Sequence, residues 1–250
     1  MSGAPVEIAA QVVRWQAEHG RNQLPWQNTR DAYRVWLSEI MLQQTQVVTV
    51  LEYYARFLAR FPDVRQLAAA PQDEVLALWS GLGYYSRARN LHRCAQIVVA
   101  EHGGEFPRTV HELAALPGIG RSTAGAIAAF CFGVRAPILD ANVRRVLTRA
   151  LGFGADLAEA RNERALWSLA EALLPDTDLA STMPRYTQGL MDLGAGICLP
   201  RSPCCMLCPL QPVCVAGRAG DAERYPVRTR KLKRRAEAWW LLLRQDGAGR

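Results

Sequence analysis

The chain has 250 residues, of which half are hydrophobic, and a formal net charge of +7. This length allows one large domain or two smaller ones, with enough apolar residues for a substantial core. No apolar run approaches the roughly 20 residues of a membrane span, and the start MSGAPVEIAA lacks the regions of a signal peptide. We therefore expect a cytoplasmic protein without a membrane partner, in a reducing compartment.

The positive charge is concentrated near the C-terminus. Residues 224–235, RYPVRTRKLKRR, hold seven basic residues and no acid, and the remaining 23 basic residues are balanced by 23 acidic ones. A basic chain suggests a nucleic-acid partner. Any such site in the body of the protein must be built from local groupings.

Helical periodicity dominates the chain, and no segment before about residue 236 shows convincing strand alternation. Asp31 is a candidate N-cap, Pro71 opens a helix with acids in its first turn, and Gly103 ends another. The expected helices lie near 5–19, 31–44, 46–61, 71–80, 86–102, 110–116, 121–132, 141–151, 157–174 and 179–197. WWLLL, residues 239–243, is instead typical of a buried strand, which cannot stand alone. We expect an all-α protein whose chain ends just inside a further domain.

A tight helix–turn–helix is predicted for LPGIGRSTAGAI, residues 116–127. Gly118 and Gly120 let the backbone turn sharply and approach another surface closely. The free N–H groups that begin the following helix would then suit a phosphate. An ordinary connection between two helices is the competing interpretation.

Five of the seven cysteines lie in ICLPRSPCCMLCPLQPVC, residues 197–214. In a reducing compartment such a group favours metal binding over disulfides. One set of four, C-x6-C-x2-C-x5-C, consists of Cys198, Cys205, Cys208 and Cys214. Four thiolates suit either zinc or a [4Fe–4S] cluster by ligand type alone.

Several of these blocks resemble one family. LPGIGRSTAGAI followed by PILDANVRRVL resembles the helix-hairpin-helix, Gly/Pro–Asp superfamily of DNA glycosylases. LPWQNTRDAYRVWLSEIMLQQTQ (24–46) and LWSGLGYYSRARNLH (78–92) are similar to its adenine glycosylase (MutY-type) branch. The resemblance covers roughly residues 8–218.

The resemblance implies two helical modules with a DNA cleft between them. A six-helix module with the hairpin would span 25–134, and residues 1–24 and 135–222 would form an iron–sulfur cluster module. Residues 223–250 would be a basic linker and the start of a missing C-terminal domain, related to Nudix hydrolases, that recognises 8-oxoguanine.

The implied activity is hydrolysis of the N-glycosidic bond of adenine opposite 8-oxoguanine or guanine in double-stranded DNA, by a monomer, in base excision repair. In bacteria such a protein would associate with the nucleoid. Two alternatives stay open: an endonuclease III-like pyrimidine glycosylase with lyase activity, and a non-catalytic iron–sulfur DNA-binding protein or redox sensor.

Glu39 lies at the border of the apolar stripe of its helix. It is either an ordinary solvent-facing glutamate or a partly desolvated acid with a raised pKa. The resemblance implies that Glu39 is the general acid that protonates adenine at N7.

Asp140 precedes a helix and is a candidate N-cap. The resemblance implies that its carboxylate also stabilises the oxocarbenium-like sugar, with Asn142 orienting water or the carboxylate. Ser122 stands where lyase-competent relatives such as endonuclease III carry the lysine that forms a Schiff base. The only lysines here are Lys231 and Lys233, so we predict a monofunctional glycosylase.

The resemblance also implies DNA contacts from positions that wedge into the duplex or touch the base opposite adenine: Gln44, Thr45, Leu82 and Tyr84. Core packing is the competing interpretation of Tyr84. Arg87 and Arg89 either reach phosphates or solvate a helix face.

The cysteine spacing matches the iron–sulfur loop of the superfamily. The resemblance therefore implies a [4Fe–4S] cluster on Cys198, Cys205, Cys208 and Cys214, with Cys204 spare. The cluster would hold a loop that presents Arg201 to DNA.

Overall fold

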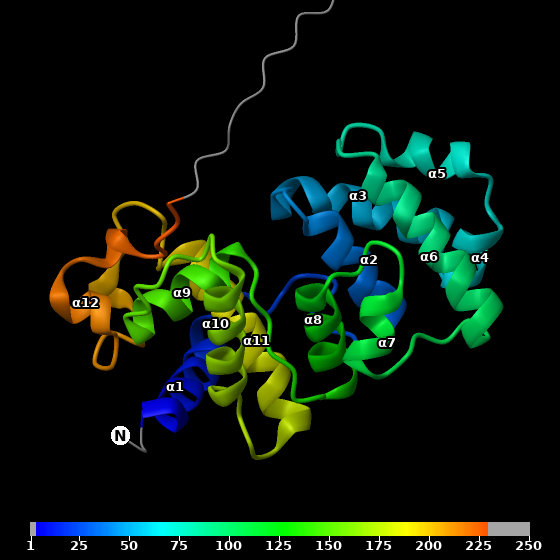
Figure 1. Cartoon of the computed structure of the whole chain (residues 1–250). Helices are drawn as coiled ribbons and strands as arrows, with labels where there is room; N and C mark the ends of the chain where they lie inside the picture. The colour runs from blue at the N-terminus through cyan, green and yellow to red at the C-terminus, as the bar shows by residue number, and fades with distance from the viewer. Residues whose placement is uncertain (1–3, 230–250) are drawn as a thin grey trace, which may run out of the picture.

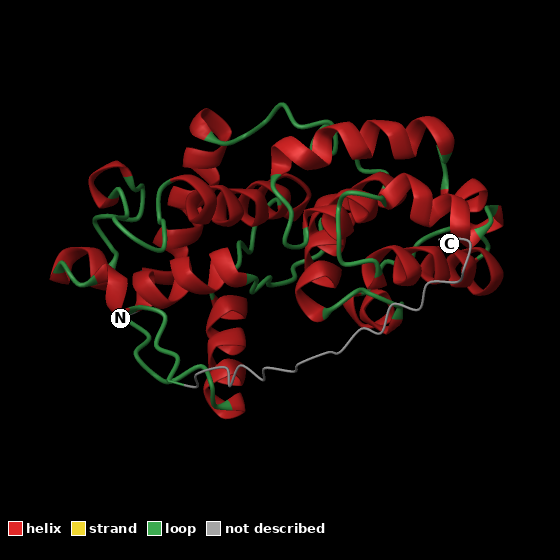
Figure 2. Cartoon of the chain, turned by 90° about the horizontal axis from the view of Figure 1, so that it is seen from above, coloured by secondary structure: helices red, strands yellow, loops and turns green. Residues whose placement is uncertain are grey.

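The computed structural model describes residues 4–229, with side chains from residue 7 onward. This part of the chain consists of helices and loops and contains no strand, as Figure 2 shows. The expected all-α fold is thus confirmed. The predicted strand at 239–243 lies outside the described residues.

Twelve α-helices and two short 3-10 turns make up the described chain. They are α1 (Ala4–His19), α2 (Ala32–Leu42), α3 (Val47–Arg60), α4 (Val64–Ala69), α5 (Gln72–Trp79), α6 (Ser86–His102), α7 (Val110–Ala115), α8 (Arg121–Phe132), α9 (Ala141–Leu151), α10 (Ala160–Ala172), α11 (Leu179–Gly196), η1 (Cys205–Leu207), α12 (Val215–Ala219) and η2 (Ala222–Arg224). None of the described helices is long and apolar enough to cross a membrane.

Local capping explains several helix boundaries. The Asp31 side chain accepts hydrogen bonds from the backbone N–H groups of Tyr33 and Arg34, which fixes the start of α2. Gly103 ends α6 in the left-handed conformation that glycine adopts without strain.

Seven helices, α2 to α8, lie between residues 25 and 134, where six were expected. The additional helix is α4, which has six residues and is capped by the Asp63 side chain. Length alone does not explain the difference, because the expected helix α7 is equally short; the N-cap Asp63 was the available signal for α4.

The buried side chains form two hydrophobic clusters. The helices around them form two lobes, which Figure 1 shows. The first cluster is built from residues 26–136 and centres on aromatic rings such as Trp36, Phe57 and Trp79. The second cluster joins residues 8–12 of α1 to α9, α10 and α11. The chain therefore leaves the second lobe after α1, builds the first, and returns.

Helix α8 lies between the two clusters. Ala124, Ile127 and Ala128 face the first cluster, whereas Ala126 and Ala129 face the second. Small residues let both lobes approach this helix closely. The predicted module boundaries at residues 134 and 222 stay predictions.

Candidate active site and cysteine cavity

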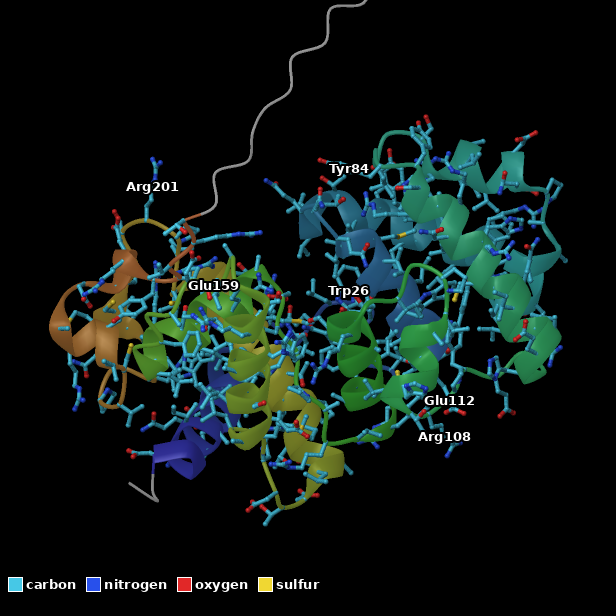
Figure 3. The ribbon with its side chains drawn as sticks, viewed as in Figure 1. Trp26, Tyr84, Arg108, Glu112, Glu159 and Arg201 are labelled. Carbon is cyan, nitrogen blue, oxygen red and sulfur yellow. The ribbon has the colours of Figure 1, made fainter. Side chains whose placement is uncertain are left out.

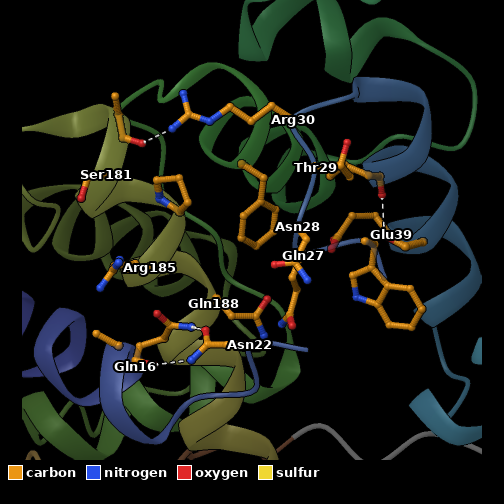
Figure 4. A pocket seen from close by; sticks show the side chains of 17 residues that line it. Gln16, Asn22, Gln27, Asn28, Thr29, Arg30, Glu39, Ser181, Arg185 and Gln188 are labelled. Carbon is orange, nitrogen blue, oxygen red and sulfur yellow. Dashed lines mark hydrogen bonds between the residues drawn. The ribbon is translucent and has the colours of Figure 1, made fainter. Parts of the chain in front are cut away.

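A cavity of about 680 Å³ lies between α2 and the facing ends of α1 and α11. The cavity is lined by Gln16 and Ala17 of α1, Asn22, residues 26–30, Val35, Ser38 and Glu39 of α2, Phe130 of α8, and Ala180, Ser181, Pro184, Arg185 and Gln188 of α11. Figure 4 shows Glu39 across the cavity from a group of amide side chains that includes Gln188. Segments far apart in sequence thus build one cavity whose walls combine apolar side chains with polar groups, a form suited to a small molecule or a base.

Glu39 is partly buried in the cavity wall because α2 turns its neighbours Trp36, Leu37 and Ile40 into the first cluster. Burial and, second, the charge of Asp140 raise the pKa of Glu39 to about 8. Its carboxyl therefore holds a proton at neutral pH. A protonated carboxyl at a cavity wall is able to act as a general acid.

Asp140 is the N-cap of α9, and its Oδ1 accepts a hydrogen bond of 2.8 Å from the Val143 N–H. It does not line the cavity beside Glu39, yet its charge is close enough to raise the pKa of Glu39. The fold thus brings the two predicted catalytic carboxyls together from helices a hundred residues apart.

The segment before Asp140 is held against α8. The Ser122 hydroxyl accepts a hydrogen bond of 3.0 Å from the Leu139 N–H. One turn later, a Cβ on Gly125 would lie 2.4 Å from the Pro137 carbonyl oxygen. Ser122 and Gly125 therefore form a docking face for residues 137–139.

Asn142 contacts the arginine that reaches the cysteine loop. Its Oδ1 accepts a hydrogen bond of 2.9 Å from Arg145, which also donates to the carbonyl oxygens of Cys198 and Gly194. Arg145 is buried and makes these bonds with backbone and amide oxygens. Helix α9 therefore carries Asp140 at its start and joins the cysteine loop one turn later.

The sequence did not single out a polar network on the α11 side. Gln188 donates a hydrogen bond of 2.8 Å to Asp192, a buried carboxylate that also accepts from the Arg21 backbone and guanidinium. Trp26 at the cavity wall was missed as well. The sequence did contain a signal for this network: Asp192 lies within the apolar stretch MDLGAGI. A carboxylate buried in such a stretch needs hydrogen-bond donors nearby.

Most of the predicted DNA-contact residues are exposed. Tyr84 is 63% exposed, so the core-packing alternative for it was wrong. Gln44 and Arg201 are also exposed and Thr45 is partly so, and Figure 3 shows Tyr84 and Arg201 at the same edge of the molecule, one on each lobe. Leu82 is different, since it is 6% exposed and packs in the first cluster. In this conformation Leu82 is not available to a duplex, and its contact with DNA stays a prediction.

The predicted hairpin joins α7 to α8 and leaves both glycines exposed. Gly118 has a φ of +79° and packs so closely on Asn90 that a Cβ would lie 3.0 Å from that side chain. Gly120 is the N-cap residue of α8 and offers no side-chain cap. The first N–H groups of α8 are therefore left to an external acceptor.

The four predicted cysteine ligands line one small cavity, whereas Cys204 is exposed beside it. The Arg149 guanidinium lies 3.4 Å from the Cys198 sulfur, and the Gly217 N–H donates to the Cys214 sulfur at 3.3 Å. Burial raises the pKa of Cys208 to about 11. Within residues 4–229 no three cysteine, histidine or acidic side chains are gathered as a site for a single metal ion. Four cysteine side chains lining one cavity, with N–H donors to two of the sulfurs, fit a metal–sulfur cluster by donor chemistry.

Comparison with known proteins agrees with this architecture. Residues 37–172 match the family described as HhH-GPD superfamily base excision DNA repair protein. An adenine DNA glycosylase of Buchnera aphidicola subsp. Acyrthosiphon pisum is 39% identical over 94% of this chain and 66% of its own length. That of Mycolicibacterium smegmatis is 42% identical over 84% of this chain and 68% of its own. The structure of a thermostable thymine-DNA glycosylase superposes with a TM-score of 0.76 at 30% identity, covering 86% of this chain and 97% of that one.

The two-lobed helical fold, with two carboxyls near a cavity between distant segments, is consistent with a base excision DNA repair protein. The chain belongs to the HhH-GPD superfamily of base excision DNA repair proteins. It spans about two thirds of the length of the two curated relatives described above.

Proposed function

We propose that this protein is a monofunctional DNA glycosylase that removes adenine mispaired with 8-oxoguanine or guanine in double-stranded DNA. The observation that carries the proposal is Glu39, whose pKa is raised to about 8 at a cavity wall close to Asp140. A proton donor with a second carboxyl close by suits the departure of a poor leaving group from a sugar. The relatives named adenine DNA glycosylases support the choice of base.

In the proposed reaction the flipped adenine occupies the cavity. Glu39 transfers its proton to a ring nitrogen of adenine, and the bond from that base to C1′ breaks with both electrons passing to the base. Asp140 stabilises the resulting sugar cation by its charge. A water oxygen then bonds to C1′ and its released proton returns to the Glu39 carboxylate, which leaves an abasic site.

The monofunctional character rests on Ser122. A hydroxyl cannot form the Schiff base that a lyase requires, and the Ser122 oxygen is engaged by the Leu139 N–H. We therefore expect no strand cleavage beyond the spontaneous rate and no adduct trapped by borohydride.

The duplex would lie across the edge that carries Gln44, Thr45, Tyr84 and Arg201, with phosphates at the hairpin glycines. A [4Fe–4S] cluster on Cys198, Cys205, Cys208 and Cys214 would supply a rigid crosslink of the loop that bears Arg201. The protein would act as a monomer.

Single-turnover release of adenine from a duplex with A opposite 8-oxoguanine tests the proposal. The wild-type protein should release adenine, and Glu39→Gln should bind the duplex without releasing it. Loss of duplex binding in Glu39→Gln would leave its loss of activity unexplained by acid catalysis, and no release by the wild-type protein would contradict the proposal.

A second candidate follows from the superposition on a thymine-DNA glycosylase. The same assay with T opposite G separates the two, because the proposed enzyme should leave thymine in place. Release of thymine in preference to adenine would favour the second candidate.

A further inference from the structure

Arg87, in the first turn of α6, is buried among backbone oxygens instead of reaching toward phosphates. Its NH1 group donates to the carbonyl oxygens of Ile40, Met41 and Gln43 at 3.0, 2.9 and 2.6 Å. These carbonyls are at the end of α2, where the last helical carbonyls lack the usual i+4 partners, although the Ile40 oxygen also accepts from the Gln43 N–H at 3.4 Å. Half of the guanidinium thus binds the turn that leads into Gln44 and Thr45.

The other half of the same guanidinium binds a second turn. NH2 donates to the carbonyl oxygens of Leu82 and Gly83 at 3.1 and 3.3 Å, and to the Thr45 hydroxyl at 3.2 Å. One planar group therefore joins the turn at residues 43–45 to the turn at residues 82–84.

Aromatic rings hold the guanidinium in this position. Its carbon lies 5.2 Å from the centre of the Trp79 ring and 5.7 Å from that of Tyr84. Both distances are within the range of cation–π attraction. Trp79 is fully buried in the first cluster, whereas Tyr84 is exposed, so the group links the core to the surface.

Each of the two turns contains a strained residue. Gln44 has a φ of +59° and Tyr84 a φ of +48°, although neither is glycine. Such conformations persist where the surroundings determine them, and they concentrate at functional surfaces. The hydrogen bonds of Arg87 end at residues that flank Gln44 and Tyr84 in both turns.

We propose that Arg87 is a positioning residue that holds the 43–45 turn and the 82–84 turn at a fixed separation, so that both meet a duplex as one rigid surface. The inference rests on the proposed function, because it takes mispaired duplex DNA as the ligand. Through this surface Arg87 would determine the preference for mispaired over matched duplex.

The substitution Arg87→Lys distinguishes this positioning role from a role in which Arg87 only supplies a positive charge to DNA phosphates. Lys keeps the positive charge but has one ammonium group, whereas the planar fork of Arg donates to several oxygens in fixed directions. A phosphate-binding arginine would tolerate the change. Arg89, exposed two residues later on the same helix, provides the matched control Arg89→Lys.

The test uses hydrogen exchange of the free protein and equilibrium binding to two duplexes, one with A opposite 8-oxoguanine and one fully matched. Arg87→Lys should speed amide exchange in both turns and lower the mispaired-to-matched affinity ratio about tenfold, since several charge-assisted hydrogen bonds are lost. Arg89→Lys should change neither the exchange of the turns nor this ratio. Unchanged exchange in either turn, or an unchanged ratio in Arg87→Lys, would overturn the proposal.

A second variant applies if Arg87→Lys does not fold. Thr45→Val removes one acceptor in the first turn, and the proposal expects faster exchange in the second turn, at residues 82–84. Unchanged exchange there would overturn it. The hydrogen-exchange measurement needs no DNA. A wild-type protein that releases no adenine would therefore contradict the proposed function, whereas the coupling of the two turns by Arg87 would still be tested by exchange.

Discussion

The Ser122 hydroxyl accepts a 3.0 Å hydrogen bond from the Leu139 N–H, the residue directly before Asp140. The serine therefore does more than replace a lyase lysine, because it holds the backbone that positions a proposed catalytic carboxylate. A lysine side chain has no acceptor for this N–H. Lyase chemistry and this anchor thus cannot be provided by the same side chain.

We predict that Ser122→Ala slows single-turnover adenine release and lowers the free energy of unfolding by about 1–3 kcal/mol, because a part-buried N–H loses its partner. Ser122→Thr should restore much of both, since it keeps the hydroxyl. Denaturant unfolding and single-turnover kinetics measure the two effects. An alanine variant equal to wild type in rate and stability would show that the bond positions nothing.

Acid catalysis by Glu39 predicts a specific pH profile. The proton-donating form predominates below its raised pKa of about 8, so the single-turnover rate should fall as pH rises through that value. Glu39→Gln should reduce the rate by roughly 10²–10⁴-fold, the usual worth of a general acid. Glu101→Gln, at an exposed site on α6, is the control. A rate that stays constant from pH 7 to 9.5 would exclude Glu39 as the acid.

The same pKa has a consequence for stability. Glu39 ionises near 4.5 when unfolded and about 8 when folded, so the native state binds its proton more tightly. Its destabilising effect is absent below pH 4.5 and grows as pH rises toward 8, by about 1.4 kcal/mol per pH unit. Glu39→Gln should therefore be more stable than wild type at pH 7. Its free energy of unfolding should also fall less between pH 4.5 and 8. Equal stability of the two proteins at pH 7 would mean that the acid carries no burial cost.

The cysteine loop offers a matched pair of variants. Cys205 lines the shared cavity and Cys204 is exposed next to it. Cys205→Ser should abolish the visible absorbance expected of an iron–sulfur cluster, because a ligand is lost, whereas Cys204→Ser should retain it. Iron analysis of the purified proteins checks both. Loss of absorbance in Cys204→Ser alone would show that Cys204, and not Cys205, is a ligand.

The contact between α8 and the segment before Asp140 requires glycine at position 125. Gly125→Ala would place a Cβ 2.4 Å from the Pro137 carbonyl oxygen, so either α8 or residues 137–139 must move. We expect reduced stability and slower adenine release. Gly196→Ala, whose Cβ would meet no atom within 4 Å, should not lower stability, since alanine favours helix. Indistinguishable unfolding curves for the two variants would show that the backbone adjusts freely.

Local sequence signals were sufficient to predict where most helices lie, but not which side chains are buried. Asp31 and Gly103 mark helix ends because capping depends on neighbouring backbone groups. Helix α4 was missed although its N-cap, Asp63, was an available signal. Leu82 and Arg87 were expected near DNA or solvent, yet both are buried.

The sequence by itself determined the all-α class, the family blocks, the cysteine spacing and the choice of Glu39 and Asp140, because these depend on residue type and short-range order. Only the tertiary structure decided that Asp140 raises the pKa of Glu39, that Ser122 holds Leu139, and that Arg87 joins two turns. The reason is physical: a pKa, a cavity wall or a buried guanidinium is set by groups that long-range packing brings within a few ångströms, and local sequence does not specify which groups those are.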